Sequence, residues 1–124
     1  LAALARTDNA RAFRRIYESP AIYELGVGAA RIRLRDYPGA RAALQRALEE
    51  DVSLAAAHFM LSQLAQLEGD TAQRMNEARM AAELQPGSAA MHDAYATALR
   101  AAGQLEEAAA EYERAIALEP HWAA

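Results

Sequence analysis

The sequence contains neither cysteine nor lysine among its 124 residues. Without cysteine it has no disulfide framework, no thiolate nucleophile and no cysteine-ligated zinc site. Without lysine it has no phosphate-binding loop of the Walker type. Aromatic residues make up only 6% of the chain, and alanine is the commonest residue. This composition favours helices in close contact over a thick central core.

A long apolar run is also missing. The longest stretch without a charged residue, 52–67, is shorter than the ~20 apolar residues that a membrane-spanning helix needs. We therefore expect a buried helix there and no direct membrane insertion. A cytoplasmic location is expected. Because the sequence begins with Leu1 and not with methionine, a periplasmic or membrane-anchored parent protein stays open.

The net charge of −4 is unevenly distributed. Residues 1–50 contain nine arginines against six acidic residues, whereas residues 51–124 contain four arginines against eleven. We interpret these charges as solvated helix faces. A nucleic-acid partner is not expected, because such a surface usually brings a basic excess to the whole domain.

The strongest pattern is an internal repeat. The stretch 89–120 contains two helical runs joined at Gly103, with apolar residues three or four positions apart. Several of its residues recur 34 positions earlier: Gly103 aligns with Gly69, His92 with His58, Ala115 with Ala81, Leu118 with Leu84 and Pro120 with Pro86. Two helices in each 34-residue period are typical of a helical solenoid.

The repeat predicts the organisation of the chain. Helices are expected at 21–34, 37–50, 54–68, 71–84, 89–102 and 105–118. One domain, 1–124, would contain a partial N-terminal unit (1–19), repeat units at 20–52, 53–86 and 87–120, and the start of a further unit or a tail (121–124). The predicted N-caps are Ser19, Asp36, Ser53, Asp70 and Ser88. In the first helix Gly28 would leave room for the partner helix, whereas nothing in the sequence explains Gly26.

The repeat units carry a known motif. The third unit has His92, Tyr95, Ala96 and Leu99 in its first helix, and Ala108, Tyr112 and Pro120 in and after its second. This pattern resembles the tetratricopeptide repeat, which has a Trp, Leu-Gly and Tyr followed by Ala, Phe and Pro. The resemblance covers 20–122. It implies an all-α, right-handed superhelical solenoid of antiparallel helix pairs, with about three 34-residue units plus a partial N-terminal one.

The upstream units depart from the motif. In the second unit Arg74 stands where the family has a small alanine. In the first unit Arg31 replaces the tyrosine, and Glu24 replaces the tryptophan. Arg31 could pair with Glu24 or Asp36, or reach a carboxylated ligand, and the sequence does not decide between them.

The resemblance implies a function in protein–protein interaction. In this family the leading helices line a concave groove that binds a peptide or protein segment, often within a larger scaffold or adaptor protein. The positions that would face this groove are Leu25, Ala29, Ile32, Arg33, Phe59, Gln63, Gln66, Asp93, Thr97 and Arg100. Leu25, Ala29 and Phe59 stand where carboxylate-clamp members carry polar donors. We therefore predict a partly apolar groove that reads side chains, anchored by Phe59 with Leu25.

Catalytic interpretations have weaker support. The Gly26-x-Gly28 pair lacks the third glycine of a dinucleotide fingerprint. His58 and Ser62 lie one helical turn apart and could be a base and a nucleophile, and His58 with His92 could bind a metal. We favour packing roles, because both histidines occupy the same position in adjacent repeats. No enzyme activity, catalytic residue, cofactor or metal is predicted.

One alternative function stays open. The chain could be a structural or oligomerisation segment of a larger protein, even an enzymatic one. Its uncapped C-terminal helix, around Leu105, Tyr112 and Trp122, would then make the contact, and a homo-oligomer through this end is one form of that alternative.

Overall fold

The structure is a computed structural model that describes residues 20–119, and all six of their regular elements are α-helices. These are α2 (Pro20–Arg33), α3 (Tyr37–Glu50), α4 (Ala55–Glu68), α5 (Thr71–Leu84), α6 (Ala89–Ala101) and α7 (Leu105–Leu118). The all-α prediction is confirmed, and each helix end lies within one residue of its predicted position. The predictions for 1–19 and 120–124, including the Ser19 cap and Trp122, fall outside the described residues. None of the helices in 20–119 has the length and apolarity needed to cross a bilayer.

Side-chain caps explain where three of the helices begin. In each, a side-chain oxygen of the N-cap accepts a hydrogen bond from the backbone N–H three residues later, which satisfies an otherwise unpaired donor. The bonds are Gly39 N to Asp36 Oδ1 (3.0 Å), Gln73 N to Asp70 Oδ1 (3.1 Å) and Met91 N to Ser88 Oγ (3.3 Å). The predicted Ser53 cap is wrong, because the N-cap of α4 is Leu54, which makes no side-chain cap bond.

The turns inside the three helix pairs share one backbone conformation. Gly69 and Gly103 have φ angles of 76° and 82°, and Arg35, which is 34 residues before Gly69, has a φ of 61°. A residue with a Cβ pays roughly 1–2 kcal/mol in this left-handed region, whereas glycine pays little. The first helix pair therefore places an arginine where the other two use glycine.

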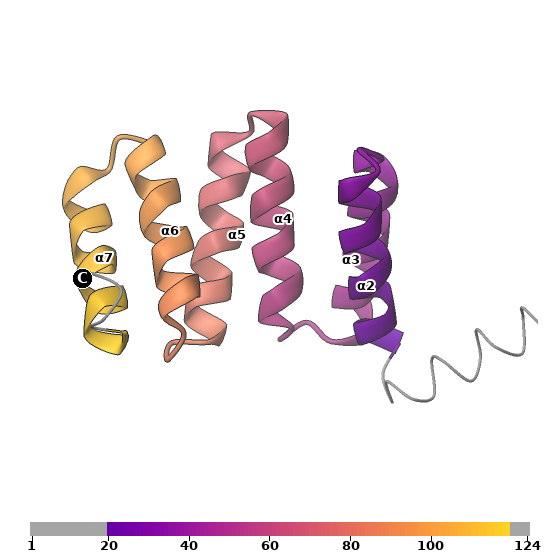
Figure 1. Cartoon of the computed structure of the whole chain (residues 1–124), viewed down its shortest axis with the longest axis horizontal. Helices are drawn as coiled ribbons and strands as arrows, with labels where there is room; N and C mark the ends of the chain where they lie inside the picture. Colours follow the sequence, from indigo (N-terminus) through magenta and orange to yellow (C-terminus); the bar gives the residue numbers. More distant parts are fainter. Residues whose placement is uncertain (1–19, 120–124) are drawn as a thin grey trace, which may run out of the picture. The chain divides into compact units, whose positions relative to one another are not determined.

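Contacts divide the chain into two units between Val52 and Ser53, at the end of the first predicted repeat. In the first unit α2 packs against α3. In the second unit α4 packs against α5, α5 against α6 and α6 against α7, so that four helices lie side by side in chain order (Figure 1). The division into one domain with three repeats stays a prediction.

The interior is made of small residues. Every buried apolar residue in the described part of the chain is an alanine or a leucine. Alanine lets helix axes approach closely but buries little area, so each helix pair depends strongly on its few leucines. The largest fully buried side chains are Leu44, Leu64 and Leu99.

The two glycines of α2 have different surroundings. A Cβ added to Gly28 would lie 2.8 Å from Leu44 Cδ2 and 2.9 Å from Leu44 Cγ, so α2 and α3 are in direct contact there. A Cβ added to Gly26 would meet nothing within 4 Å. The predicted packing role of Gly28 has a structural basis, and Gly26 is free to change.

Alanine substitutions at these glycines are expected to have opposite effects on stability. Gly26→Ala should raise the free energy of unfolding by about 0.5–1 kcal/mol, because glycine is costly inside a helix. Gly28→Ala gains the same helix preference but forces Leu44 aside, and overpacking a core costs about 1–3 kcal/mol. Urea denaturation followed by circular dichroism measures both. A loss of stability in Gly26→Ala would contradict the open space seen around this residue.

Candidate functional site

A hollow of about 300 Å³ lies in the second unit between α4 and α6. We call it the α4–α6 hollow. Five of its lining residues belong to the set predicted to face a groove: Phe59, Gln63 and Gln66 of α4, and Asp93 and Thr97 of α6. They come together because they recur on the same face of the leading helix in adjacent repeats. Phe59, Asp93 and Thr97 are half-buried, and the two glutamines are exposed.

The remaining lining residues were not predicted. They are Ser62, Arg74, Ala90 and Ala94. The two alanines leave space on the α6 side. Ser62 Oγ donates a hydrogen bond of 2.9 Å to the backbone carbonyl of Arg74, which joins α4 to α5. The sequence places Arg74 where the repeat family has a small alanine, but this pattern does not predict the direction of the arginine side chain.

Two charged groups of the α4–α6 hollow have no partner among residues 20–119. The Arg74 guanidinium and the Asp93 carboxylate make no hydrogen bond or ion pair with each other or with any other residue in 20–119. Both side chains are half-buried. A partly desolvated charge without a partner is costly, so this hollow favours an occupant that supplies complementary charges.

Thr97 is held in place by α7. Its hydroxyl donates to the backbone carbonyl of Asp93 (2.8 Å) and lies 3.0 Å from Tyr112 Oη. Because the single Thr97 hydroxyl hydrogen points to Asp93, Tyr112 is the donor in the second bond. Arg100 does not line the hollow, and its guanidinium carbon lies 5.8 Å from the centre of the Tyr112 ring.

The other predicted groove residues lie in the first unit. Leu25, Ala29 and Ile32 of α2 are half-buried, and Arg33 is exposed. A joint anchor of Leu25 with Phe59 stays a prediction. In the same helix pair, Arg31 pairs with Asp36 at 2.6 Å and Glu24 pairs with Arg46 at 3.2 Å, so Asp36, and not Glu24, is the acid that Arg31 contacts. The backbone N–H of Gly39, and then Arg31, lower the pKa of Asp36.

Each of the two repeat-equivalent histidines bonds a glutamate. His58 Nδ1 lies 2.7 Å from Glu77 Oε2, and His92 Nδ1 lies 2.7 Å from Glu111 Oε2. The glutamates are themselves 34 residues apart. Sequence reasoning missed them, although their shared distance of 19 residues from each histidine was available as a signal. In residues 20–119 no three His, Asp or Glu side chains gather in a way that could hold a metal ion.

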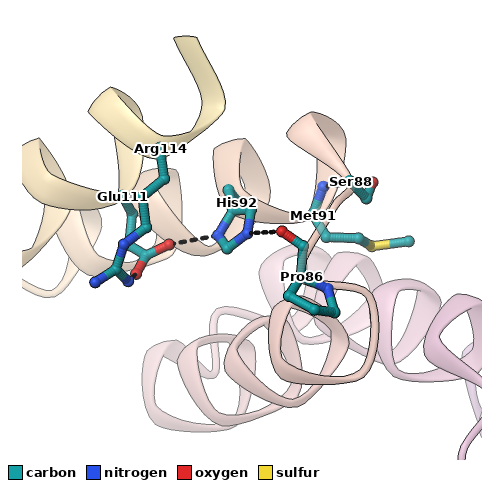
Figure 2. A network of polar contacts seen from close by, with 6 residues as sticks. All are labelled: Pro86, Ser88, Met91, His92, Glu111 and Arg114. Carbon is teal, nitrogen blue, oxygen red and sulfur yellow. Dashed lines mark hydrogen bonds and ion pairs between the residues drawn. The ribbon is translucent and has the colours of Figure 1, made fainter. Parts of the chain in front are cut away.

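The second pair belongs to a larger network. Figure 2 shows His92 between Glu111 on α7 and Pro86 in the loop before α6, with Arg114 on the far side of Glu111. His92 Nε2 lies 2.7 Å from the Pro86 carbonyl oxygen, which can only accept. Nε2 is therefore the donor in the bond to Pro86. Ser62, by contrast, donates its hydroxyl to the Arg74 carbonyl, so this serine is not aligned with His58 as a nucleophile.

A second hollow, of about 490 Å³, borders this network between α5 and α7. Its lining includes His92, Tyr95, Glu107 and Glu111. Burial, and then the nearby carboxylates of Glu107 and Glu111, raise the pKa of Tyr95. The charged groups around it are largely paired: Arg114 binds Glu111, and Arg79 binds Glu83 at 3.2 Å.

The surface of α7 bears on the predicted oligomer contact. Leu105, Ile116 and Leu118 are exposed apolar residues of this helix. Tyr112 is half-buried and bonds Thr97, so a change there would disturb the α4–α6 hollow as well. Contact between copies through α7 stays a prediction.

Comparison with known proteins identifies the fold. Neither protein-family models nor curated proteins give a match to this sequence. Among solved structures, MamA is similar with a TM-score of 0.76 and 21% identity over 83% of this chain, which spans 60% of the MamA chain. The first TPR of Spaghetti (RPAP3), bound to the HSP90 peptide SRMEEVD, has a TM-score of 0.75 and 20% identity over 81% of this chain and 79% of its own.

A third similar structure is a mutant of the Thermobaculum terrenum O-GlcNAc transferase, with a TM-score of 0.73 and 25% identity. The match covers 82% of this chain but only 19% of the transferase, so it concerns the helical repeats and not the enzyme as a whole. The helix pairs, the repeat of 34 residues and these similarities agree. The chain has the tetratricopeptide-repeat fold.

Proposed function

We propose that this chain is a protein-interaction module that binds a short extended peptide segment in the α4–α6 hollow. The observation that carries the proposal is the convergence of Phe59, Gln63 and Gln66 with Asp93 and Thr97 on one hollow. Its volume of about 300 Å³ suits one or two side chains of a peptide and is at the small end of ligand pockets. A role within a larger scaffold or adaptor protein is part of the same proposal.

The chemistry of the lining supports an extended peptide. An exposed glutamine amide both donates and accepts, so Gln63 and Gln66 can bond the N–H and C=O groups of a peptide backbone. The half-buried Phe59 ring offers an apolar contact between them and α6. Aromatic residues in such central positions often supply most of the binding energy. The Spaghetti domain bound to the SRMEEVD peptide is a precedent for peptide binding by this fold.

Selection from random peptides tests the proposal. Peptides displayed on phage are selected on the purified full chain, and an enriched peptide is synthesised with a fluorescent label. Its dissociation constant is measured by fluorescence anisotropy. We expect Phe59→Glu to weaken binding roughly 30-fold, the effect of losing about 2 kcal/mol at an interface hot spot.

Leu67→Glu is the matched control. Leu67 lies on the same helix as Phe59, is exposed and does not line the α4–α6 hollow. The substitution therefore introduces the same negative charge outside the proposed binding site. Its dissociation constant should equal that of the wild type. Failure to enrich any peptide, or equal binding by Phe59→Glu and the wild type, would overturn the proposal.

A further inference from the structure

Arg74 is the one arginine of the second unit whose guanidinium is unoccupied in the described part of the chain. Arg79 pairs with Glu83, Arg114 pairs with Glu111, and Arg100 lies over the Tyr112 ring. Within 20–119 Arg74 makes hydrogen bonds only through its backbone, and it lines the α4–α6 hollow.

The other repeats carry a small residue at the position of Arg74. The equivalent residues 34 positions away, Ala40 and Ala108, have exposed fractions of 0% and 3%. They lie where the two helices of a pair meet. An arginine cannot be buried there without a partner, so the side chain of Arg74 extends out of the helix pair into the hollow. The helices still meet, because Ser62 Oγ bonds the Arg74 carbonyl.

We propose that Arg74 binds the carboxylate of an aspartate or glutamate side chain in the peptide held by the α4–α6 hollow. This inference rests on the proposed function and names the chemistry of its partner. The guanidinium offers five donors in a planar fork, which matches a carboxylate in two parallel hydrogen bonds. The unpaired Asp93 in the same hollow repels a second acid, so the peptide carries one acidic side chain at Arg74 and a neutral or basic one at Asp93.

The test uses an enriched phage-selected peptide with its C-terminus amidated, which removes the terminal carboxylate as a source of the anion. Each acidic residue is replaced in turn by its amide, Asp by Asn or Glu by Gln. When binding to the wild-type chain is measured, one of these replacements should raise the dissociation constant about tenfold, the effect of losing one charge-assisted hydrogen bond. When binding to Arg74→Ala is measured, the same replacement should leave the dissociation constant unchanged.

Arg74→Ala is a conservative choice for folding, because the equivalent repeats already carry alanine there. Arg74→Lys should bind with intermediate affinity, since it keeps the charge but loses the planar fork. Enriched peptides without acidic residues, or an amide replacement that weakens binding equally to wild type and Arg74→Ala, would overturn this inference and leave the proposed function standing. Complete failure of peptide selection would overturn both. If amidation of the peptide C-terminus alone abolishes binding, the anion that Arg74 binds is the terminal carboxylate of the peptide. This outcome would also reject the side-chain proposal.

Discussion

Replacing Glu111 with leucine is expected to lower the free energy of unfolding by about 1–3 kcal/mol, the typical loss when a buried polar group is left without its hydrogen-bond partner. The side chains of His92 and Glu111 are only 10% and 8% exposed. In the variant, His92 keeps its bond to the Pro86 carbonyl, but Nδ1 faces an apolar side chain. His92 loses the hydrogen-bond partner of its Nδ1 and Arg114 loses its ion pair, while the bond between Thr97 and Tyr112 still joins α6 to α7. Urea denaturation followed by circular dichroism measures the change.

The double variant His92→Leu with Glu111→Leu distinguishes the effect of removing the pair from the effect of removing Glu111 alone. Two apolar side chains in place of a buried pair are often neutral for stability, so we expect the double variant to recover most of the loss. Glu107→Leu on the same helix is exposed and should change stability by less than about 0.5 kcal/mol. A double variant that is less stable than Glu111→Leu would show that His92 contributes independently of the glutamate.

The helices of this chain could be predicted because their signals are local. Asp36, Asp70 and Ser88 cap the residues that follow them, and glycine marks the turns at Gly69 and Gly103. One helix start was predicted wrongly: the N-cap of α4 is Leu54, one residue after Ser53, and it makes no side-chain cap bond. The first turn has no glycine to mark it, because Arg35 adopts the positive φ there.

The candidate site was only partly predictable. The register of the repeat was sufficient to place Phe59, Gln63, Gln66, Asp93 and Thr97 on one face, because equivalent positions recur with the same orientation. Pairings between helices were not predictable. The bond from His92 to Glu111 and the path of the Arg74 side chain depend on the distance between helix axes and on rotamers, which a repeat pattern does not contain. The position of Arg100 over the ring of Tyr112, outside the lining of the hollow, depends on the same distances and rotamers, and its place in the predicted groove stays a prediction.

Leu99→Ala is expected to cost about 3–5 kcal/mol, the upper part of the range for truncating a buried leucine. The cost depends on how well the neighbouring side chains can move into the cavity. Here the buried apolar neighbours are alanines and a few leucines, and alanine has no rotamers with which to fill space. Leu99 is 1% exposed, whereas Leu67 is 55% exposed. Leu67→Ala is therefore a control with the same substitution at the surface, and it should change the free energy of unfolding by less than about 0.5 kcal/mol. Equal melting curves for the two variants would show that the alanine-rich interior rearranges around a missing leucine.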